Sequence, residues 1–309
     1  MKKKVLITGG LGFIGSKICK ILLKKNYEVI ILDNLLSNTS KKIKNCKLIK
    51  SDITNFKSLQ KIKIRNIDSV IHLAAQSSGP RSFLYPDEDV NINIIGTINI
   101  IKFCNFKKVK KIIFASSFTV YGNQKKSRVN EKLNCNPISF YAVSKFACEN
   151  YIKILCEKFK IDWTILRLFN VYGPGQDMAR MDQGIVSIFL NLVKKNSIIK
   201  IKGSRYRFRD LVFIDDVSNA FYHCLKKRQL TKNQIFNLGT GKKVFVHEMI
   251  NKIASLYNKK VKIKEVGFTP GDINGCYSEN TKLKKTGFNF QFNFEKGLKI
   301  FKNWFDNEK

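Results

Sequence analysis

The chain is poor in proline, histidine and arginine and has no long apolar run. Its 309 residues include 5 prolines and 3 histidines, which excludes collagen-like and proline-rich proteins. No stretch of about 18 consecutive apolar residues occurs, so no membrane-spanning helix is expected. The apolar run after the basic N-terminus leads straight into glycines, which is typical of a first strand and not of a signal peptide.

Paired cysteines of the metal-binding kind are also missing. The sequence has 8 cysteines, but none form a C-x-x-C pair and the histidines do not cluster with them. We therefore expect no metal site and no disulfide framework. Reduced, buried thiols in a cytoplasmic protein are the simplest interpretation.

Acidic residues are scarce, with 23 Asp and Glu against 57 Lys and Arg, which gives a formal charge of +34. Such a balance raises nucleic acid or an anionic membrane as a partner. Only nine of the basic residues are arginine, the type that base readout and phosphate forks favour. Because Lys, Ile and Asn share A/T-rich codons, codon bias is a sufficient explanation. We predict no nucleic-acid partner, and we keep one alternative, a positive field that helps to capture an anionic small substrate.

What is present is a globular composition, with 44% hydrophobic and 26% charged residues. Short apolar runs alternate with helical patterns in the first half. Strands are predicted at residues 5–7, 29–32, 47–49, 69–73, 112–114 and 164–166, and helices at about 12–25, 55–63, 88–106 and 140–159. Continuous apolar strands that alternate with helices predict the doubly wound, parallel α/β sheet of the Rossmann type.

The pattern changes after about residue 168. A Gly-Pro-Gly breaker at 173–175 precedes a predicted helix at 183–195, a basic aromatic loop at 202–209 and a strand–helix unit at 211–225. We predict a dinucleotide-binding domain of residues 1–168 plus about 210–234. A smaller, discontinuous C-terminal domain, of about 169–209 plus 235–309, is expected to bind the substrate.

Three glycines, Gly9, Gly12 and Gly15, lie between the first strand and the first helix. Glycine permits the tight turn and lets the backbone approach a pyrophosphate, and the helix N-terminus supplies free N–H groups. In this strand–turn–helix context the spacing predicts dinucleotide binding. Phe13 and Ile14 belong to the same turn.

Asp33 follows the second strand, where a carboxylate can accept both adenosine ribose hydroxyls. It opposes a 2′-phosphate, and no Arg or Lys occupies positions 34–36, so NAD is favoured over NADP. Asn34 lies beside it. Asp52 and Ile53 after the third strand suit the adenine edge and face. Leu73, Ala74 and Ala75 after the fourth strand offer small side chains for close passage of the cofactor, whereas His72 is expected to be packed and not to act as a base.

Tyr141 and Lys145 form a Y-x-x-x-K pair on a predicted helix. Residues four apart share a helix face, so the phenol and the ammonium point into one space. A nearby cation is expected to pull the pKa of a tyrosine down from about 10 toward neutrality, which makes it a base for a hydroxyl. Ser117, after the fifth strand, can hydrogen-bond the same substrate oxygen.

Through these motifs the chain resembles the extended short-chain dehydrogenase/reductase family, and within it the NAD-dependent nucleotide-sugar epimerases and dehydratases. The resemblance rests on TGGxGFIG, HLAA, SSxxVYG, YxxxK and RLFNVYGPGQ, in this order. It implies that Ser117, Tyr141 and Lys145 are the catalytic set and that Lys145 also holds the nicotinamide ribose.

Within that family, the residues after Ser117 favour the 4-epimerases. Dehydratases that this chain resembles place Asp-Glu where it has Phe118 and Thr119, which cannot do that acid–base work. The implied reaction is loss of the 4′-hydroxyl proton to Tyr141, hydride transfer to NAD, and hydride return to the opposite face. The alternatives are a 4-keto reductase or another epimerase of a deoxysugar nucleotide. A non-catalytic dinucleotide-sensing or nucleic-acid-binding protein is a more distant one.

The resemblance also implies a substrate site in the second half. The expected substrate residues are Ser78, Ser117, Thr119, Tyr141, Asn170, Arg209, Asp272 and Cys276. Asn170 and Arg209 match family residues that contact the diphosphate, and a small Cys276 favours acceptance of N-acetyl sugars. Thr269 stands where many relatives carry a phosphate-binding Arg. Arg205, Tyr206 and Arg207 are either nucleotide contacts or a solvated basic loop. A homodimer through the helices at 88–106 and 140–159 and a role in polysaccharide biosynthesis are further expectations; the base and the sugar stay open.

Overall fold

The computed structural model describes residues 2–36 and 42–308. Met1, residues 37–41 and Lys309, which the expected domain ranges include, lie outside the described residues. Within the described residues, the central element is a seven-stranded sheet with the order β12-β7-β5-β4-β1-β2-β3. Its strands are β1 (Lys4–Thr8), β2 (Glu28–Asp33), β3 (Lys47–Lys50), β4 (Ser69–His72), β5 (Lys111–Ser117), β7 (Asp162–Leu168) and β12 (Gln234–Leu238). Every pair in it is parallel.

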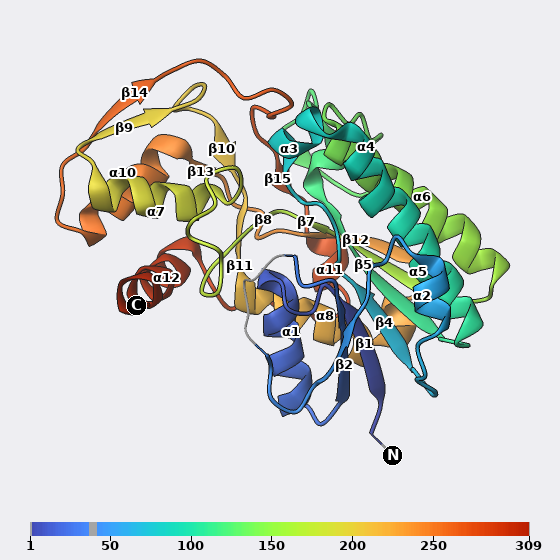
Figure 1. Ribbon diagram of the computed structural model, residues 1–309. Helices are drawn as coiled ribbons and strands as arrows, with labels where there is room; N and C mark the ends of the chain where they lie inside the picture. The colour runs from blue at the N-terminus through green and yellow to red at the C-terminus, as the bar shows by residue number, and fades with distance from the viewer. Residues whose placement is uncertain (1, 37–41, 309) are drawn as a thin grey trace.

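Helices cover both faces of this sheet, which confirms the doubly wound α/β fold (Figure 1). The helices α1 (Phe13–Lys24) and α8 (Ile214–Lys226) pack together against one face. The helices α2 (Phe56–Gln60), α5 (Gly96–Phe106) and α6 (Phe140–Lys158) contribute to the apolar core on the other face. Central strands such as β5, in which every residue is buried, read as continuous apolar runs because helices lie on both sides.

The predicted helix at 88–106 is interrupted. It consists of α4 (Pro86–Asp89), the π-helical turn η1 (Val90–Ile95) and α5. Inside η1, the buried Asn93 side chain donates to the Gln76 carbonyl oxygen at 3.1 Å and to Asp89 Oδ1 at 3.0 Å. Through Asn93, the widened turn satisfies backbone groups of the loop that follows β4. The periodicity of the sequence does not predict this turn.

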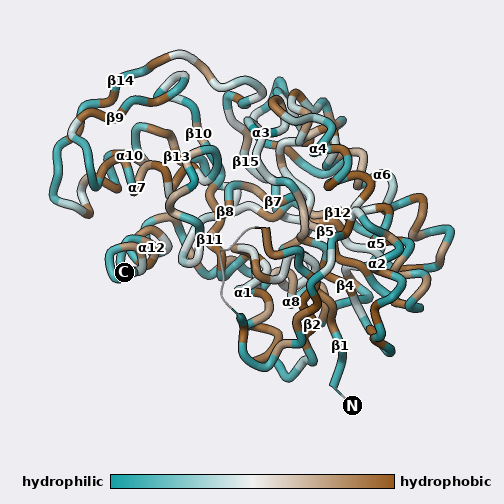
Figure 2. Tube along the Cα trace, in the orientation of Figure 1, coloured by the Kyte–Doolittle hydropathy of each residue, from teal (hydrophilic) through white to brown (hydrophobic). Residues whose placement is uncertain are grey.

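The remaining elements form a second layer beside the sheet, at the left of Figure 1. They are the strand pairs β8 (Asn170–Tyr172) with β11 (Leu211–Phe213), β9 (Ile198–Ile201) with β14 (Lys262–Glu265), and β10 (Phe208–Arg209) with β13 (Val244–Phe245), and the helices α7 (Ile185–Lys195), α10 (Val246–Leu256) and α12 (Phe294–Asn307). They enclose a separate apolar core. Figure 2 shows hydrophobic residues along β1 and β2 and hydrophilic ones at the N-terminal approach to β1.

Several shorter elements complete the structure. They are α3 (Gly79–Leu84), the 3₁₀ turn η2 (Phe118–Tyr121), β6 (Arg128–Val129) with its partner β15 (Tyr277–Ser278), α9 (Arg228–Thr231) and α11 (Thr281–Lys284). No helix in the described part of the chain is long and apolar enough to cross a membrane.

The strand β12 corrects the approximate boundary near residue 234. Its residues pair with β7 from Gln234 opposite Thr164 to Leu238 opposite Leu168. Phe236 and Leu238 are buried, so residues 235–238 complete the sheet and do not belong to the second layer. The division into a dinucleotide-binding and a substrate-binding part stays a prediction.

Candidate active site

The carboxyl ends of the parallel strands meet along one edge of the sheet. The strands β1 and β4 are neighbours there, and the chain order runs outward from them in opposite directions. This reversal is the topological switch point at which open α/β sheets bind ligands. The residues that end β1, β2, β4 and β5 are Thr8, Asp33, His72 and Ser117, and they therefore lie along this edge of the sheet.

The glycine turn after β1 packs too closely against neighbouring backbone to admit side chains. Gly9 has φ +66°, and a Cβ there would lie 2.8 Å from the Ala74 backbone nitrogen. A Cβ on Gly15 would collide with the Gly9 carbonyl oxygen. The following helix begins at Phe13, and among the described residues no side chain caps it. Its first amides, which include those of Phe13 and Ile14, suit the pyrophosphate of a dinucleotide, so the predicted turn fits the cofactor.

Asp33 holds this turn in place as well as facing the crevice. Its Oδ2 accepts from the Leu11 N–H at 3.0 Å and its Oδ1 from the Leu35 N–H at 2.9 Å. Only 6% of the residue is exposed. Each carboxylate oxygen keeps a second lone pair for a ribose hydroxyl. The sequence pointed to the ribose acceptor but gave no sign of the bond to Leu11.

The other predicted cofactor residues line the same edge. Asn34 Oδ1 accepts from the Leu36 N–H at 3.2 Å. Asp52 is half-buried, and its Oδ1 accepts from the N–H and the hydroxyl of Thr54 at 2.8 Å each. Ile53 is buried. These geometries leave Asp52 one oxygen for the adenine edge.

The segment after β4 is fixed by Thr8. The N–H groups of Leu73 and Ala74 both donate to Thr8 Oγ1 at 3.2 Å, and Leu73, Ala74 and Ala75 are half-buried. His72 lies between two hydroxyls, 2.7 Å from Thr8 Oγ1 and 3.0 Å from Thr97 Oγ1. Burial, helped by the charge of Lys145, lowers the pKa of His72 to about 3. The prediction that His72 is packed is confirmed.

Ser117, Tyr141 and Lys145 come together at the carboxyl end of β5. Ser117 ends the strand, and its Oγ accepts from the Thr119 hydroxyl at 2.9 Å. The helix α6 starts beside it, with Ser139 Oγ accepting from the Ala142 N–H at 3.2 Å as the N-cap. Lys145 Nζ lies 6.0 Å from the centre of the Tyr141 ring and 4.6 Å from that of Phe114. The predicted triad is thus one cluster.

The electrostatics of Tyr141 differ from the expectation. Burial raises the pKa of Tyr141 to about 12, and the hydrogen bond with Ser117 offsets only part of that rise. Burial also lowers the pKa of Lys145. Desolvation disfavours the charged form of both groups, so the expected lowering of the Tyr141 pKa by Lys145 is not seen.

A buried polar network that the sequence did not reveal supports the loop before the triad. Gln76 donates from Nε2 to Asp89 Oδ1 at 2.8 Å and to the Ser78 carbonyl at 3.0 Å. Asn93 bridges Asp89 to Ser144 of α6, with Nδ2 3.1 Å from Ser144 Oγ. Asp89 is fully buried. Each of these polar groups looks ordinary in the sequence, and only the fold brings them together.

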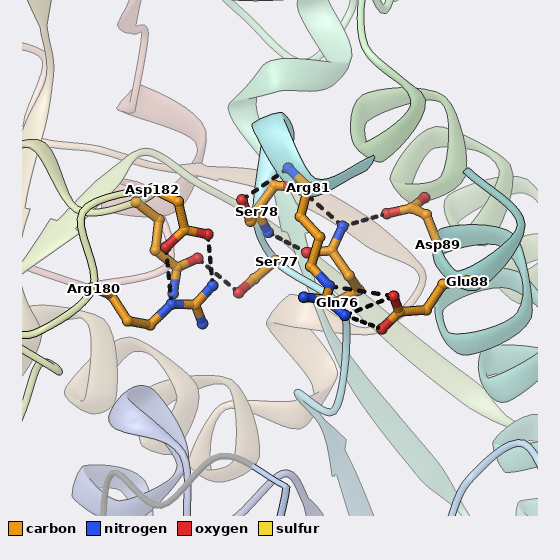
Figure 3. A network of polar contacts seen from close by, with 9 residues as sticks. Gln76, Ser77, Ser78, Arg81, Glu88, Asp89, Arg180 and Asp182 are labelled. Atoms are coloured by element: carbon orange, nitrogen blue, oxygen red, sulfur yellow. Dashed lines mark hydrogen bonds and ion pairs between the residues drawn. The ribbon is translucent and has the colours of Figure 1, made fainter. Parts of the chain in front are cut away.

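Figure 3 shows how this network reaches across the crevice. Gln76 points to Asp89, while the ion pair of Arg180 and Asp182 lies close to Ser77. Ser77 Oγ lies 2.9 Å from the side-chain amide of Gln183. Ser78 is buried, and its hydroxyl accepts from the Arg81 N–H at 3.2 Å. The predicted substrate role of Ser78 stays a prediction.

The predicted substrate residues of the second half lie close to one another. Asn170 N–H donates to the Asp210 carbonyl at 3.1 Å, which places Asn170 beside Arg209. Among the described residues, the buried Asn170 Oδ1 has no hydrogen-bond partner. Arg209 Nη2 donates to Asp272 Oδ1 at 2.6 Å.

Cys276 is buried in an apolar cluster with Phe118 and Phe169, whose rings stack with centres 5.2 Å apart. Phe118 directly follows Ser117 in the chain. The cluster therefore joins the predicted substrate residue Cys276 to the end of β5.

Comparison with known proteins agrees with this geometry. A protein of Methanocaldococcus jannaschii, provisionally named as a UDP-glucose 4-epimerase, is 35% identical, and the match covers 98% of each chain. The solved structure of the UDP-glucose 4-epimerase of Thermus thermophilus in complex with NAD has a TM-score of 0.90 and 29% identity, and the match covers 99% of this chain and 100% of that one.

A second solved structure is UDP-N-acetylglucosamine 4-epimerase from Methanobrevibacter ruminantium in complex with UDP-N-acetylmuramic acid. It has a TM-score of 0.90 and 30% identity, with 99% of each chain covered. The model of the NAD dependent epimerase/dehydratase family matches residues 5–239. On fold, site geometry and sequence, this chain belongs to the NAD-dependent epimerase/dehydratase family.

Proposed function

We propose that the chain is an NAD-dependent nucleotide-sugar 4-epimerase that acts on a UDP-hexose. The observation that carries the proposal is the cluster of Ser117, Tyr141 and Lys145 at the end of β5, followed by Phe118 and Thr119. The cluster offers one base for a hydroxyl, and the two residues that follow offer no acid for a departing hydroxyl group. Such a set suits a reaction in which the proton and the hydride that leave the sugar are both returned to it.

In this proposal Tyr141 accepts the proton of the sugar 4′-hydroxyl and later returns it. Ser117 donates a hydrogen bond to the same oxygen, and Lys145 favours the ionised phenol through its charge. NAD, when bound, would supply the acceptor and donor of the C4 hydride and the positive charge of its oxidised ring. The residues proposed to hold it are the glycine turn, Asp33 and Lys145.

The 4-keto sugar must turn over before the hydride returns. The nucleotide diphosphate is then the anchor, with Asn170 and Arg209 as its contacts. This division between a fixed nucleotide and a mobile sugar explains return of hydride to either face.

The test is a product-resolved assay of the purified protein with a panel of nucleotide sugars. We expect interconversion of UDP-glucose and UDP-galactose with no net change in the absorbance of reduced nicotinamide and with NAD retained through gel filtration. Replacing Tyr141 by Phe should abolish turnover while NAD stays bound. Steady consumption of NADH or NADPH would instead establish the alternative, a 4-keto reductase.

A second candidate substrate is a UDP-N-acetylhexosamine. Cys276 is small and buried at the sugar end, and one similar solved structure is a UDP-N-acetylglucosamine 4-epimerase. We expect Cys276→Tyr to lower kcat/KM for UDP-N-acetylglucosamine at least tenfold more than for UDP-glucose. Equal losses on both substrates, or no turnover of the acetylated sugar by the native protein, contradict this candidate.

We also propose a homodimer and a cytoplasmic location. Tyr151 and Ile154 of α6 are 42% and 67% exposed, and α6 packs against η1, on which Val90 and Ile95 are also exposed. Such an apolar face is typical of an interface. Ile154→Glu should give a monomer in light scattering, whereas Phe268→Glu, at a residue that is 77% exposed elsewhere, should not.

The eight free thiols suit the proposed cytoplasmic location, because the cytoplasm is a reducing compartment.

A further inference from the structure

Two guanidinium groups share one carboxylate near the predicted substrate residues. Asp272 accepts from Arg209 through Oδ1 at 2.6 Å and from Arg207 through Oδ2. The side chains of Arg207 and Arg209 are only 13% and 6% exposed. The two guanidiniums share one hydrogen-bonded carboxylate, and the charge of Glu265 acts on Arg207 from further away. Two partly buried guanidiniums side by side still favour the approach of a further anion.

This arrangement separates the three residues that the sequence could not tell apart. The side chain of Arg205 is 38% exposed and paired with Glu265 at 2.9 Å, and Tyr206 is 68% exposed. Arg207 alone turns inward to Asp272. The 202–209 segment is thus a solvated basic loop at two positions and a half-buried ion pair at the third.

The segment that carries Asp272 borders the catalytic helix. A Cβ on Gly271 would lie 2.6 Å from the Phe83 ring and 2.9 Å from Ser139 Cβ, and Ser139 is the N-cap of α6. The same segment continues into Ile273 and Cys276, which pack on Phe118. The arginine pair is therefore bound to a segment that packs against the N-terminus of α6, the helix that carries Tyr141.

Both arginines keep donors for a ligand. Arg207 uses Nε on the Ser204 carbonyl, Nη2 on the Lys202 carbonyl and Nη1 on Asp272, while Arg209 uses Nη1 on the Phe208 carbonyl and Nη2 on Asp272. A guanidinium has five N–H groups, so two on Arg207 and three on Arg209 have no partner among the described residues. The nearby Asp210 carboxylate is occupied by Thr240, Gly241 and Ser278.

We infer that Arg207 is a substrate-binding residue, the second cation, beside Arg209, that holds the diphosphate of the nucleotide sugar, with Asp272 fixing both guanidiniums. The inference rests on the proposed function, because that function supplies the diphosphate. It also accounts for Thr269, whose carbonyl accepts from the Asp272 N–H at 3.1 Å. Thr269 provides no positive charge at this turn, and Arg207 of the 202–209 segment provides one instead.

The test measures binding of UDP and of uridine to the NAD-saturated protein by calorimetry. Arg207→Gln should weaken UDP binding at least tenfold, which corresponds to about 1.4 kcal/mol, and leave uridine binding within twofold. KM should rise by a similar factor with kcat within threefold. Arg207→Lys, which keeps the charge but not the fork, should fall in between.

Arg205→Gln is the matched control, since it makes the same change on the same loop at an exposed side chain, and it should leave UDP affinity within twofold. Retained NAD and an unchanged melting temperature show that each variant is folded. Native UDP affinity in Arg207→Gln, or equal losses of UDP and uridine, overturns the inference. If the native protein epimerises no sugar but prefers UDP to uridine through Arg207, the proposed function fails and the anion site stands.

Discussion

Tyr141 and Lys145 illustrate at the residue scale why a motif and its environment must be considered together. The i, i+4 spacing places them on one face of α6, but burial raises the pKa of Tyr141 to about 12 and lowers that of Lys145. A phenol in that state is a poor base near neutral pH. Catalysis therefore depends on the balance between desolvation and every positive charge that borders the phenol.

Replacing Lys145 by Met should lower kcat about 100-fold or more, because less Tyr141 is then ionised. Proton transfer by a positioned base such as Tyr141 contributes about 10²–10⁴-fold. The acid limb of the pH–rate profile should also move to higher pH, since less positive charge remains to favour the ionised phenol. The variant Lys145→Arg keeps the positive charge, so its acid limb should lie between those of Lys145→Met and the native protein. An unmoved acid limb in Lys145→Met contradicts the electrostatic role.

His72 gives a prediction on stability and pH. Its pKa in the folded protein is about 3, below the ordinary value of about 6.5. As the pH falls below 6.5 the unfolded chain gains a proton that the folded protein excludes, so stability is lost toward pH 3 and is unaffected above 6.5. The expected loss is about 2 kcal/mol between pH 7 and pH 5.

Urea unfolding of the native protein and of His72→Gln at both pH values measures that difference. Glutamine can still bond Thr8 or Thr97 but does not titrate. The variant should be less stable at pH 7 and should lose about 2 kcal/mol less on going to pH 5. Parallel pH dependence in the two proteins would show that His72 is protonated without penalty.

At the scale of elements, a buried ion pair fastens α6 to the sheet. Arg167 of β7 donates to both Glu149 oxygens, at 2.9 and 2.7 Å, and Ser116 of β5 donates to Glu149 at 2.6 Å. Both side chains of the pair are at most 3% exposed. Since Tyr141 and Lys145 lie on the same helix, this pair sets their height above the strand ends.

Glu149→Ala should cost about 3–5 kcal/mol of unfolding free energy, because it leaves the Arg167 charge buried without its partner. The matched control is Glu88→Ala, which breaks the exposed pair with Arg81 and should cost at most about 1 kcal/mol. Chemical denaturation of both variants decides. Similar losses in the two would mean that the buried pair has no special weight.

The elements that the sequence predicted correctly are those with local causes. The glycine turn, the strand before it and the helix after it follow from residues within one short segment, and so do Tyr141 and Lys145 on one helix face. The Asp89 network, the Glu149–Arg167 pair and the inward turn of Arg207 depend on residues far apart in the chain. The periodicity of the sequence does not predict these contacts. The π-helical turn at Val90–Ile95 belongs to one of them, the Asp89 network.

At the scale of the whole molecule, the charge of +34 surrounds a site proposed to take a doubly charged substrate. Lysines dominate this charge, while the buried arginines Arg207 and Arg209 are aimed at a carboxylate. The global excess and the local site therefore have separate causes. The first fits codon bias, and the second fits anion recognition.

Ionic strength separates these contributions. If the field captures the substrate, kcat/KM for a UDP-sugar should fall at least fivefold between about 0.02 and 0.3 M salt, as the Debye length shortens. The kcat value should change by less than twofold. A flat kcat/KM leaves the lysine excess as background.

The position of β12 has a consequence for how the protein is made. Its residues 234–238 cover the outer edge of β7 at residues 162–168, so a nascent chain exposes that edge until most of the protein has left the ribosome. Unpaired edges of apolar strands invite pairing with other chains. The part of the second layer that lies between these two strands in the sequence must emerge while the sheet is still open, and slow synthesis of that stretch would lengthen the period in which the protein can aggregate.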